Sequence, residues 1–129
     1  MKYEEILNEC GTMQAELETV IPDELNSIID RSKTIAAYHA RTGYLLAEAK
    51  KMVRNKKSSE IANTIAKIAK EGFLSSKAQN ALVDSIASEE LYLADWLDRI
   101  NSMCVHQIDL IRSIISKEKE EMKYLNTQI

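Results

Sequence analysis

Residues 91–116 read LYLADWLDRINSMCVHQIDLIRSIIS, and one apolar stripe runs through the whole segment. The stripe advances in steps of three and four residues, at Leu93, Leu97, Ile100, Cys104, Ile108, Ile111 and Ile115. A mean step of about 3.67 residues is that of an amphipathic helix that stays nearly straight. Since no glycine or proline follows Gly72, nothing in the sequence stops this helix between Ser75 or Ser76 and about Leu125.

The length of this helix conflicts with the size of the chain. Some fifty helical residues would extend about 75 Å, whereas a compact domain of 129 residues spans only about 35–40 Å. Two outcomes resolve this conflict. Either the helix breaks near Ser85–Glu90, where Ser88-Glu89-Glu90 caps a new start, or the chain is elongated and shares its core with other copies. We expect some of both, and therefore a homo-oligomer.

A second long helix is predicted from about Pro22 to Lys57. Its apolar seam alternates steps of three and four, which is the coiled-coil period. The seam residues are Leu25, Ile28, Ser32, Ile35, His39, Thr42, Leu46, Ala49 and Val53. Beside them runs a row of small residues that would let another helix approach closely, namely Ala36, Ala40, Gly43 and Ala47.

Two shorter helices complete the prediction. The first runs from about Glu4 to Thr19 and places Ile6, Met13, Leu17 and Val20 on its apolar face. The other begins at a cap formed by Ser58 or Ser59 and ends near Lys70, with Gly72 just beyond it. The sequence thus predicts a single all-α domain over residues 1–129. We expect an elongated, self-associating bundle of about four helices, two of them long.

Composition supports this fold class and limits the location. Three glycines and one proline are too few for the tight turns of a strand-rich fold. No apolar run approaches the roughly 18 residues of a membrane span, and the first residues lack the pattern of a secretion signal. Two cysteines, Cys10 and Cys104, do not make a disulfide framework. A cytoplasmic protein without membrane contact is expected.

Charge is distributed unevenly along the chain. Residues 1–30 carry one Lys against eight acids, residues 31–80 carry eleven Lys and Arg against three acids, and residues 81–129 carry five against nine. A basic middle between acidic ends attracts an anion, the ends of its own chain, or a neighbouring copy. The sequence leaves these three interpretations open.

Candidate ligand-binding residues lie on a second face of the last helix, where aromatic and basic side chains gather. We single out Trp96, Arg99 and His106, with Tyr38 and Arg41 of the second helix as partners. An aromatic ring can stack on a nucleotide base and an Arg can hold a phosphate. The alternative is a helix–helix contact in which Trp96 and Met103 are core residues.

A basic run at the end of the second helix is a candidate anion-binding tip. Its members are Lys50, Lys51, Arg54, Lys56 and Lys57. Cations at this position also complement the helix dipole, which is sufficient reason for their presence. The negative overall charge and the 5% aromatic content argue against nucleic acid as the partner.

Patterns for catalysis and metal binding are missing from the sequence. A di-iron bundle needs Glu-x-x-His pairs, but Ala36 and Met103 stand three residues before His39 and His106. Two isolated cysteines lack zinc spacing, and there is no phosphate-cradling glycine loop. We therefore expect no enzymatic activity, no catalytic residue, no metal and no cofactor.

Two segments resemble small all-α proteins encoded by tailed phages and prophages: residues 38–50, YHARTGYLLAEAK, and residues 96–116, WLDRINSMCVHQIDLIRSIIS. The resemblance implies a phage accessory protein in the cytoplasm of a bacterial host. The leading hypothesis is an oligomer that sequesters a small anionic, nucleotide-like ligand, such as a host-defence signal. The alternatives are a protein–protein interaction module that inhibits or recruits a host or phage protein, and an accessory to single-stranded DNA handling and recombination.

Overall fold

A computed structural model describes residues 2–127 of the chain. Over this range the chain forms five α-helices and no strand: α1 (Tyr3–Leu17), α2 (Leu25–Lys57), α3 (Glu60–Glu71), α4 (Ser76–Ile86) and α5 (Ser88–Thr127). The predicted all-α class is confirmed. None of these helices, within the described range, has the length and hydropathy needed to cross a membrane.

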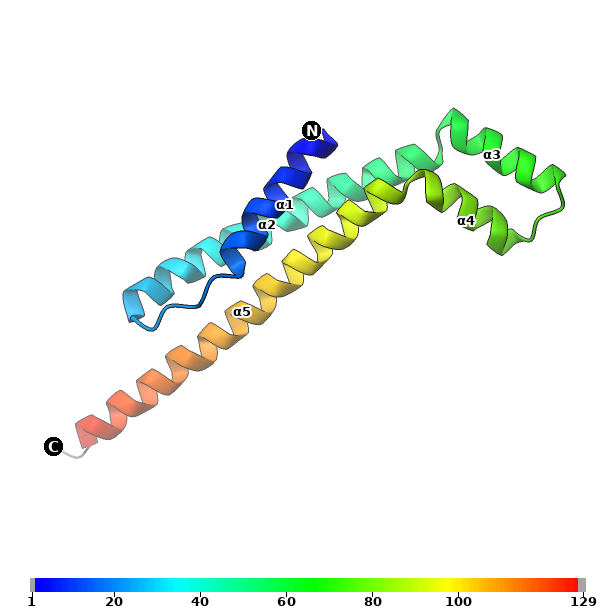
Figure 1. The fold of residues 1–129 in the computed structure, drawn as a ribbon. Helices are drawn as coiled ribbons and strands as arrows, with labels where there is room; N and C mark the ends of the chain where they lie inside the picture. Colours follow the sequence, from blue (N-terminus) through cyan, green and yellow to red (C-terminus); the bar gives the residue numbers. More distant parts are fainter. Residues whose placement is uncertain (1, 128–129) are drawn as a thin grey trace.

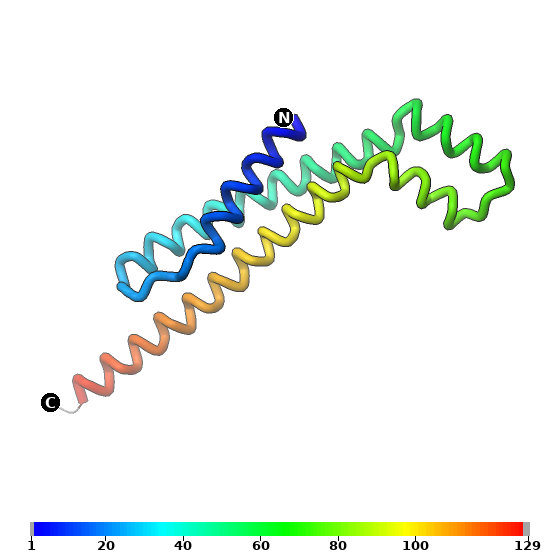
Figure 2. The backbone as a smooth tube through the Cα atoms, viewed as in Figure 1, coloured from blue at the N-terminus to red at the C-terminus, as the bar shows by residue number. Residues whose placement is uncertain are grey.

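The helices are arranged as a rod (Figure 1). α2 and α5 run antiparallel and make the most extensive helix–helix contact, and α1 packs beside both. α3 and α4 pair as a hairpin that projects from the end where α2 stops and α5 starts. At the opposite end, α5 continues past the connection between α1 and α2, which the tube in Figure 2 makes plain.

The core lies where α1, α2 and α5 meet. The predicted stripe of α5 is confirmed, because Leu93, Leu97, Ile100, Cys104 and Ile111 are buried there. Ile108 and Ile115, the remaining members, are partly buried and pack against the same core. α1 contributes the buried residues Ile6, Cys10, Met13 and Leu17.

The apolar face predicted for α1 is wrong at its last residue, because Val20 is 91% exposed. Helix α1 ends at Leu17, before Val20. The Leu17 carbonyl accepts hydrogen bonds from Gln107 Nε2 at 2.7 Å and from Arg31 Nη2 at 3.1 Å. These bonds satisfy a carbonyl that the helix end leaves without a partner, and they attach α1 to both long helices.

The seam of α2 is confirmed at every seventh residue: Ile28, Ile35, Thr42 and Ala49 are buried. It is wrong at His39 and Leu25, which are exposed, and it omitted Leu45, which is fully buried. Leu45 lies one helical turn after Arg41, on the side of α2 that α1 covers. The buried face is therefore rotated toward α1, and His39 is left outside it.

The polar Thr42 is accommodated in the core because its hydroxyl both donates and accepts hydrogen bonds. Its Oγ1 donates to the Tyr38 carbonyl at 2.8 Å and accepts from Asn101 Nδ2 at 3.0 Å. Asn101 Nδ2 also donates to the His39 carbonyl at 3.1 Å. A buried hydroxyl with both functions satisfied carries no desolvation penalty of the kind that an unpaired group would carry.

Two helix starts were predicted correctly and one was not. The Oγ atoms of Ser59 and Ser75 accept from the backbone N–H groups of Ala62 and Ala78, at 3.3 and 3.2 Å, and cap α3 and α4. Helix α2 begins at Leu25 instead of Pro22, because Glu24 is its N-cap.

The Glu24 carboxylate accepts from the Ser27 hydroxyl at 2.8 Å and from the N–H groups of Asn26 and Ser27. These three hydrogen bonds lower the pKa of Glu24, and the bond from the Ser27 side chain has the largest effect.

The predicted break falls at Ala87, between α4 and α5. It makes five helices over the described range, where about four were expected. The reason is that α4 turns away from the rod to pair with α3.

The small-residue row of α2 lies on the solvent side of the rod. Ala36, Ala40, Gly43 and Ala47 are all exposed, so no described helix of this chain uses the close approach that they permit. Self-association through this row stays a prediction.

Candidate functional site

The five predicted ligand-binding residues are divided between two surface hollows and a third, separate position. Trp96 and Arg99 line a hollow of about 470 Å³ between α1 and α5, which we call the α5 hollow. Tyr38 and Arg41 line another, of about 310 Å³, between α1 and α2. His106 is exposed on α5 and lines neither of them.

The α5 hollow combines two aromatic rings with opposite charges. Tyr92 and Trp96 are one helical turn apart, with ring centroids 5.9 Å from each other and a 50° angle between the ring planes. Trp96 Nε1 donates to Gln14 Oε1 at 2.5 Å, which fixes the indole against α1. Asp95 lines the hollow beside Arg99. The hollow offers rings for stacking, one cation and one anion.

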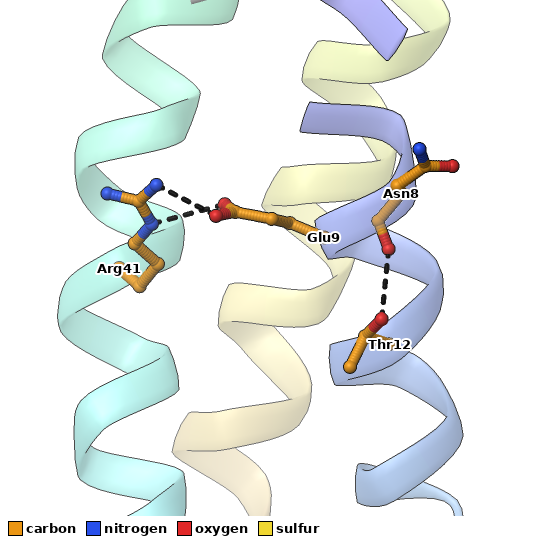
Figure 3. Close-up of polar contacts among 4 residues, drawn as sticks. All are labelled: Asn8, Glu9, Thr12 and Arg41. Atoms are coloured by element: carbon orange, nitrogen blue, oxygen red, sulfur yellow. Dashed lines mark hydrogen bonds and ion pairs between the residues drawn. The ribbon is translucent and has the colours of Figure 1, made fainter. Parts of the chain in front are cut away.

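The second hollow contains an Arg that is already neutralised (Figure 3). Arg41 Nε donates to Glu9 Oε2 at 3.1 Å, and Arg41 Nη2 donates to Glu9 Oε1 at 2.9 Å. Its guanidinium carbon also lies 5.6 Å from the centre of the Tyr44 ring. An incoming phosphate would compete with a two-point carboxylate contact for this side chain.

Tyr38 is also engaged with α1, because its hydroxyl donates to the Glu16 carboxylate. This hydrogen bond, together with partial burial, raises the pKa of Tyr38 to about 12. Tyr38 and Arg41 therefore connect the basic middle of the chain to its acidic start. This is the intramolecular charge matching that the charge distribution left open.

The predicted basic tip is partly paired. Lys57 Nζ lies 2.8 Å from Asp84 Oδ1, and Lys56 Nζ lies 3.8 Å from Glu90 Oε1. These contacts link the end of α2 to α4 and to the start of α5. Within residues 2–127, Lys50, Lys51 and Arg54 are exposed and form no ion pair, so three of the five cations have no acidic partner there.

The hairpin of α3 and α4 exposes more apolar surface than the sequence indicated. A groove of about 330 Å³ runs between its helices and is lined by Ile65, Ile68, Ala69, Gly72, Leu74 and Leu82. We call it the hairpin groove. Its rim includes Ile68 at 63% exposure, and Ile61 on the same helix is 66% exposed. The sequence signal was present, since apolar residues recur along α3 at Ile61, Ile65 and Ile68, but no binding role was predicted for them.

Phe73 sits at the turn of the hairpin with a positive φ of 59° and is 95% exposed. The N–H of Phe73 donates to the Lys70 carbonyl at 3.1 Å, and the N–H of Leu74 donates to the Ala69 carbonyl at 3.1 Å. These two bonds form a Schellman motif, in which glycine usually takes the left-handed position. Gly72, the predicted residue beyond the helix end, instead has an ordinary φ of −80°.

A second uncovered apolar surface lies at the other end of the rod. Residues 116–127 of α5 are all exposed, and we call them the C-terminal overhang. Met122 is 60%, Tyr124 64% and Leu125 61% exposed. The sequence predicted that this helix reaches about Leu125, and it left open whether the helix breaks near Ser85–Glu90 or the chain is elongated and shares its core with other copies.

The two thiols are buried, and the acids of the described part of the chain do not gather into a candidate metal site. Cys10 and Cys104 are free and buried, and burial raises the pKa of both, that of Cys10 to about 11. Neither is therefore a thiolate near neutral pH. Residues 2–127 contain no group of three or more His, Cys, Asp or Glu side chains that could hold a metal ion.

Comparison of the chain with protein-family models, with curated proteins and with solved structures finds no match. The resemblance to phage accessory proteins stays a prediction.

Proposed function

We propose that the protein is a non-enzymatic interaction module that binds a protein partner through the hairpin of α3 and α4. The observation that carries the proposal is Phe73, a large aromatic residue that is 95% exposed at a left-handed backbone position. A non-glycine residue at such a position costs about 1–2 kcal/mol. Folding alone favours glycine there, so Phe73 has a use outside the fold.

The surroundings of Phe73 support the same conclusion. The hairpin groove lies directly beside it, and Ile61 and Ile68 continue the apolar surface along α3. Aromatic anchors next to apolar pockets are typical of the centres of protein–protein interfaces. The hairpin also projects from the rod, which leaves it accessible to a partner.

The test compares capture of partner proteins by the full chain and by three variants. Phe73→Gly and Ile68→Gln each remove apolar surface from the hairpin, and capture of the partner is expected to fall at least tenfold with either. Val20→Ser is the matched control, because Val20 is 91% exposed at the other end of the rod. Equal capture by all four proteins would rule out the hairpin as the binding surface.

As a second function we propose binding of a nucleotide-like ligand in the α5 hollow, which is supported by the meeting of Trp96 and Arg99 there. The rings of Tyr92 and Trp96 would contact the base, Asp95 would accept from a base N–H, and Arg99 would hold a phosphate. Trp96 is the only tryptophan of the chain, so its fluorescence reports directly on this hollow.

Titration with a panel of linear and cyclic nucleotides tests this second function. Saturable quenching that is lost in Arg99→Gln is expected. Arg112→Gln is the control, since Arg112 is exposed on the same helix outside the α5 hollow. Its Nη1 atom lies 3.9 Å from Asp109 Oδ1. Unchanged Trp96 emission across the panel would exclude the nucleotide site.

A further inference from the structure

The α5 hollow is built mainly from a single face of α5. Four of its lining side chains stand at positions i, i+3, i+4 and i+7, the spacing that places residues on one side of a helix, and they are Tyr92, Asp95, Trp96 and Arg99. Gln14 of α1 supplies the remaining lining. A volume of about 470 Å³ is within the range of pockets that hold one small molecule. The hollow therefore has the size that suits a mononucleotide.

The indole of Trp96 is held in place by two consecutive hydrogen bonds. Trp96 Nε1 donates to Gln14 Oε1 at 2.5 Å, and Gln14 Nε2 donates to Glu18 Oε1 at 2.8 Å. Because the amide nitrogen of Gln14 is held by Glu18, its oxygen stays directed at Trp96. A ring that is already ordered loses little conformational entropy when a base stacks on it. Trp96 is therefore a fixed stacking surface, and the Gln14 amide is already engaged.

The two charged side chains of the hollow are not paired with each other. An acid four residues before an Arg has the preferred spacing for an ion pair along a helix. Asp95 and Arg99 have this spacing, yet within residues 2–127 neither side chain forms an ion pair or a side-chain hydrogen bond. Arg41 of the second hollow, by contrast, is bound to Glu9. The Asp95 carboxylate can therefore accept from a ligand N–H, and the Arg99 guanidinium can hold a phosphate.

An ionised carboxylate accepts hydrogen bonds and donates none, which limits the bases that Asp95 can read. Guanine presents two adjacent donors on its Watson–Crick edge, N1–H and the N2 amino group, and they match the two oxygens of a carboxylate. Adenine presents the acceptor N1 beside its amino group, so its lone pair would face the negative charge. Cytosine and uracil also place an acceptor next to each donor. Asp95 therefore favours guanine among the common bases.

The positions along α5 suit a nucleotide that lies along the helix. Asp95 and Arg99 are separated by about 6 Å of helix rise, and the long Arg side chain extends the distance that the pair can bridge. Trp96 stands between them in the helix. The rings of Tyr92 and Trp96 are inclined by 50° with centroids 5.9 Å apart, so one ring can stack on the face of a base while the other contacts its edge.

We infer that the α5 hollow is a guanine-nucleotide site in which Asp95 accepts from guanine N1–H and N2–H, Trp96 stacks on the base and Arg99 binds the phosphate. The inference rests on the second proposed function, since it names the base that the same hollow takes. Asp95 is the residue that determines this specificity.

Calorimetric titration of the full chain with matched nucleotides tests the inference. The panel contains guanosine, adenosine, inosine and xanthosine nucleotides, each as the monophosphate, the cyclic monophosphate and the triphosphate. In the phosphate form that binds, the guanosine nucleotide is expected to bind about tenfold more tightly than its adenosine and xanthosine counterparts. Inosine, which lacks the 2-amino group, should fall between them. Quenching of Trp96 emission by the same nucleotide places the binding in the α5 hollow.

The variant Asp95→Asn is expected to change the preferred base. An amide offers one acceptor and one donor, which match N1–H and O2 of xanthine. Affinity for the guanosine nucleotide should therefore fall about tenfold, and affinity for the xanthosine nucleotide should rise by a similar factor. This gain also shows that the variant is folded. Asp98→Asn is the matched control, because Asp98 is exposed on α5 and does not line the hollow.

The outcomes separate the inference from the function on which it rests. Equal affinity for guanosine and adenosine nucleotides, or a guanine preference that Asp95→Asn retains, would overturn the inference and leave a nucleotide site without base selection. Loss of adenosine nucleotide binding in Asp95→Asn would assign the carboxylate to the ribose hydroxyls and would also overturn it. If no member of the panel binds, the nucleotide function itself is rejected, and the inference with it.

Discussion

Arg41 of α2 binds Glu9 of α1 through two parallel hydrogen bonds, 3.1 Å from Nε to Oε2 and 2.9 Å from Nη2 to Oε1. The contact raises the pKa of Arg41, chiefly through the hydrogen bond to Glu9. It joins the basic middle of the chain to its acidic start and helps to place α1 on the rod. It also means that an Arg predicted to hold a ligand has a carboxylate partner within the fold.

A double-mutant cycle measures the strength of this contact. Glu9→Gln, Arg41→Gln and the double variant are expected to give a coupling free energy of about 0.5 kcal/mol in urea unfolding, because both side chains are more than one-third exposed. The coupling should decrease at high NaCl, which screens exposed charges. A coupling that is zero at low salt would show that the contact does not stabilise α1.

Alkaline pH should weaken the fold through Cys10. Burial raises the pKa of Cys10 from 9.0 to about 11. The Cys10 thiol therefore stays protonated in the native state at pH values where it is already deprotonated in the unfolded state. The free energy of unfolding is therefore independent of Cys10 below pH 9 and falls as the pH rises from 9 to 11. Urea midpoints measured across this range check the slope.

Two variants separate the contributions to that slope. In Cys10→Ala the decline should be shallower over the whole window, even though the smaller side chain lowers stability at every pH. In Tyr38→Phe the decline should be shallower only above pH 10, since the pKa of Tyr38 is raised from 10.0 to about 12. A wild-type slope that both variants retain would contradict this account.

The central position of α5 in the core gives a matched pair of leucine variants. Leu97 is fully buried and Leu110, on the same helix, is 51% exposed. Leu97→Ala should lower the free energy of unfolding by about 3 kcal/mol, since it leaves a cavity. Leu110→Ala should change it by less than about 0.5 kcal/mol. Similar losses in thermal or urea unfolding would mean that α5 faces the core differently.

Phe73 gives a stability prediction that is independent of any partner. Phe73→Gly should stabilise the hairpin by about 1 kcal/mol, because glycine adopts the positive φ of 59° without steric conflict. Phe73→Ala retains a Cβ atom and should give no such gain. Hydrogen exchange of the α3 and α4 amides resolves the two, and slower exchange in the alanine variant than in the glycine variant would refute the strain argument.

Much of the fold follows from local sequence signals. The stripe from Leu93 to Ile111 predicted the buried face of α5, and Ser59 and Ser75 marked two helix starts, because periodicity and capping depend on neighbouring residues only. The period of α2 could not predict that Leu45 is buried and His39 exposed. This difference depends on the side from which α1 approaches α2, and the spacing of residues within α2 does not contain that information.

The candidate site was less predictable than the fold. Residue types on the second face of α5 indicated Trp96 and Arg99, and these do share a hollow. Tyr38, Arg41 and His106 were expected to join them in pockets between subunits, and that expectation stays a prediction. Within one chain, Glu9 and Glu16 of α1 bind Arg41 and Tyr38 on another surface. Long-range pairing of this kind leaves no spacing signal in the chain.

The sequence by itself determined that the chain is helical and which side of α5 is buried, since these depend on the period of apolar residues. It also marked the starts of α3 and α4 by their caps, whereas the start of α2 and the number of helices were predicted incorrectly. Only the tertiary structure decided which surfaces remain uncovered. Helix α5 has forty residues and α2 only thirty-three, so part of α5 extends beyond its partner. Helix α4 turns away from the rod and pairs with α3. Burial is a property of two elements in contact, so the free surfaces at Leu125 and Phe73 exist only once the helices have been placed beside each other.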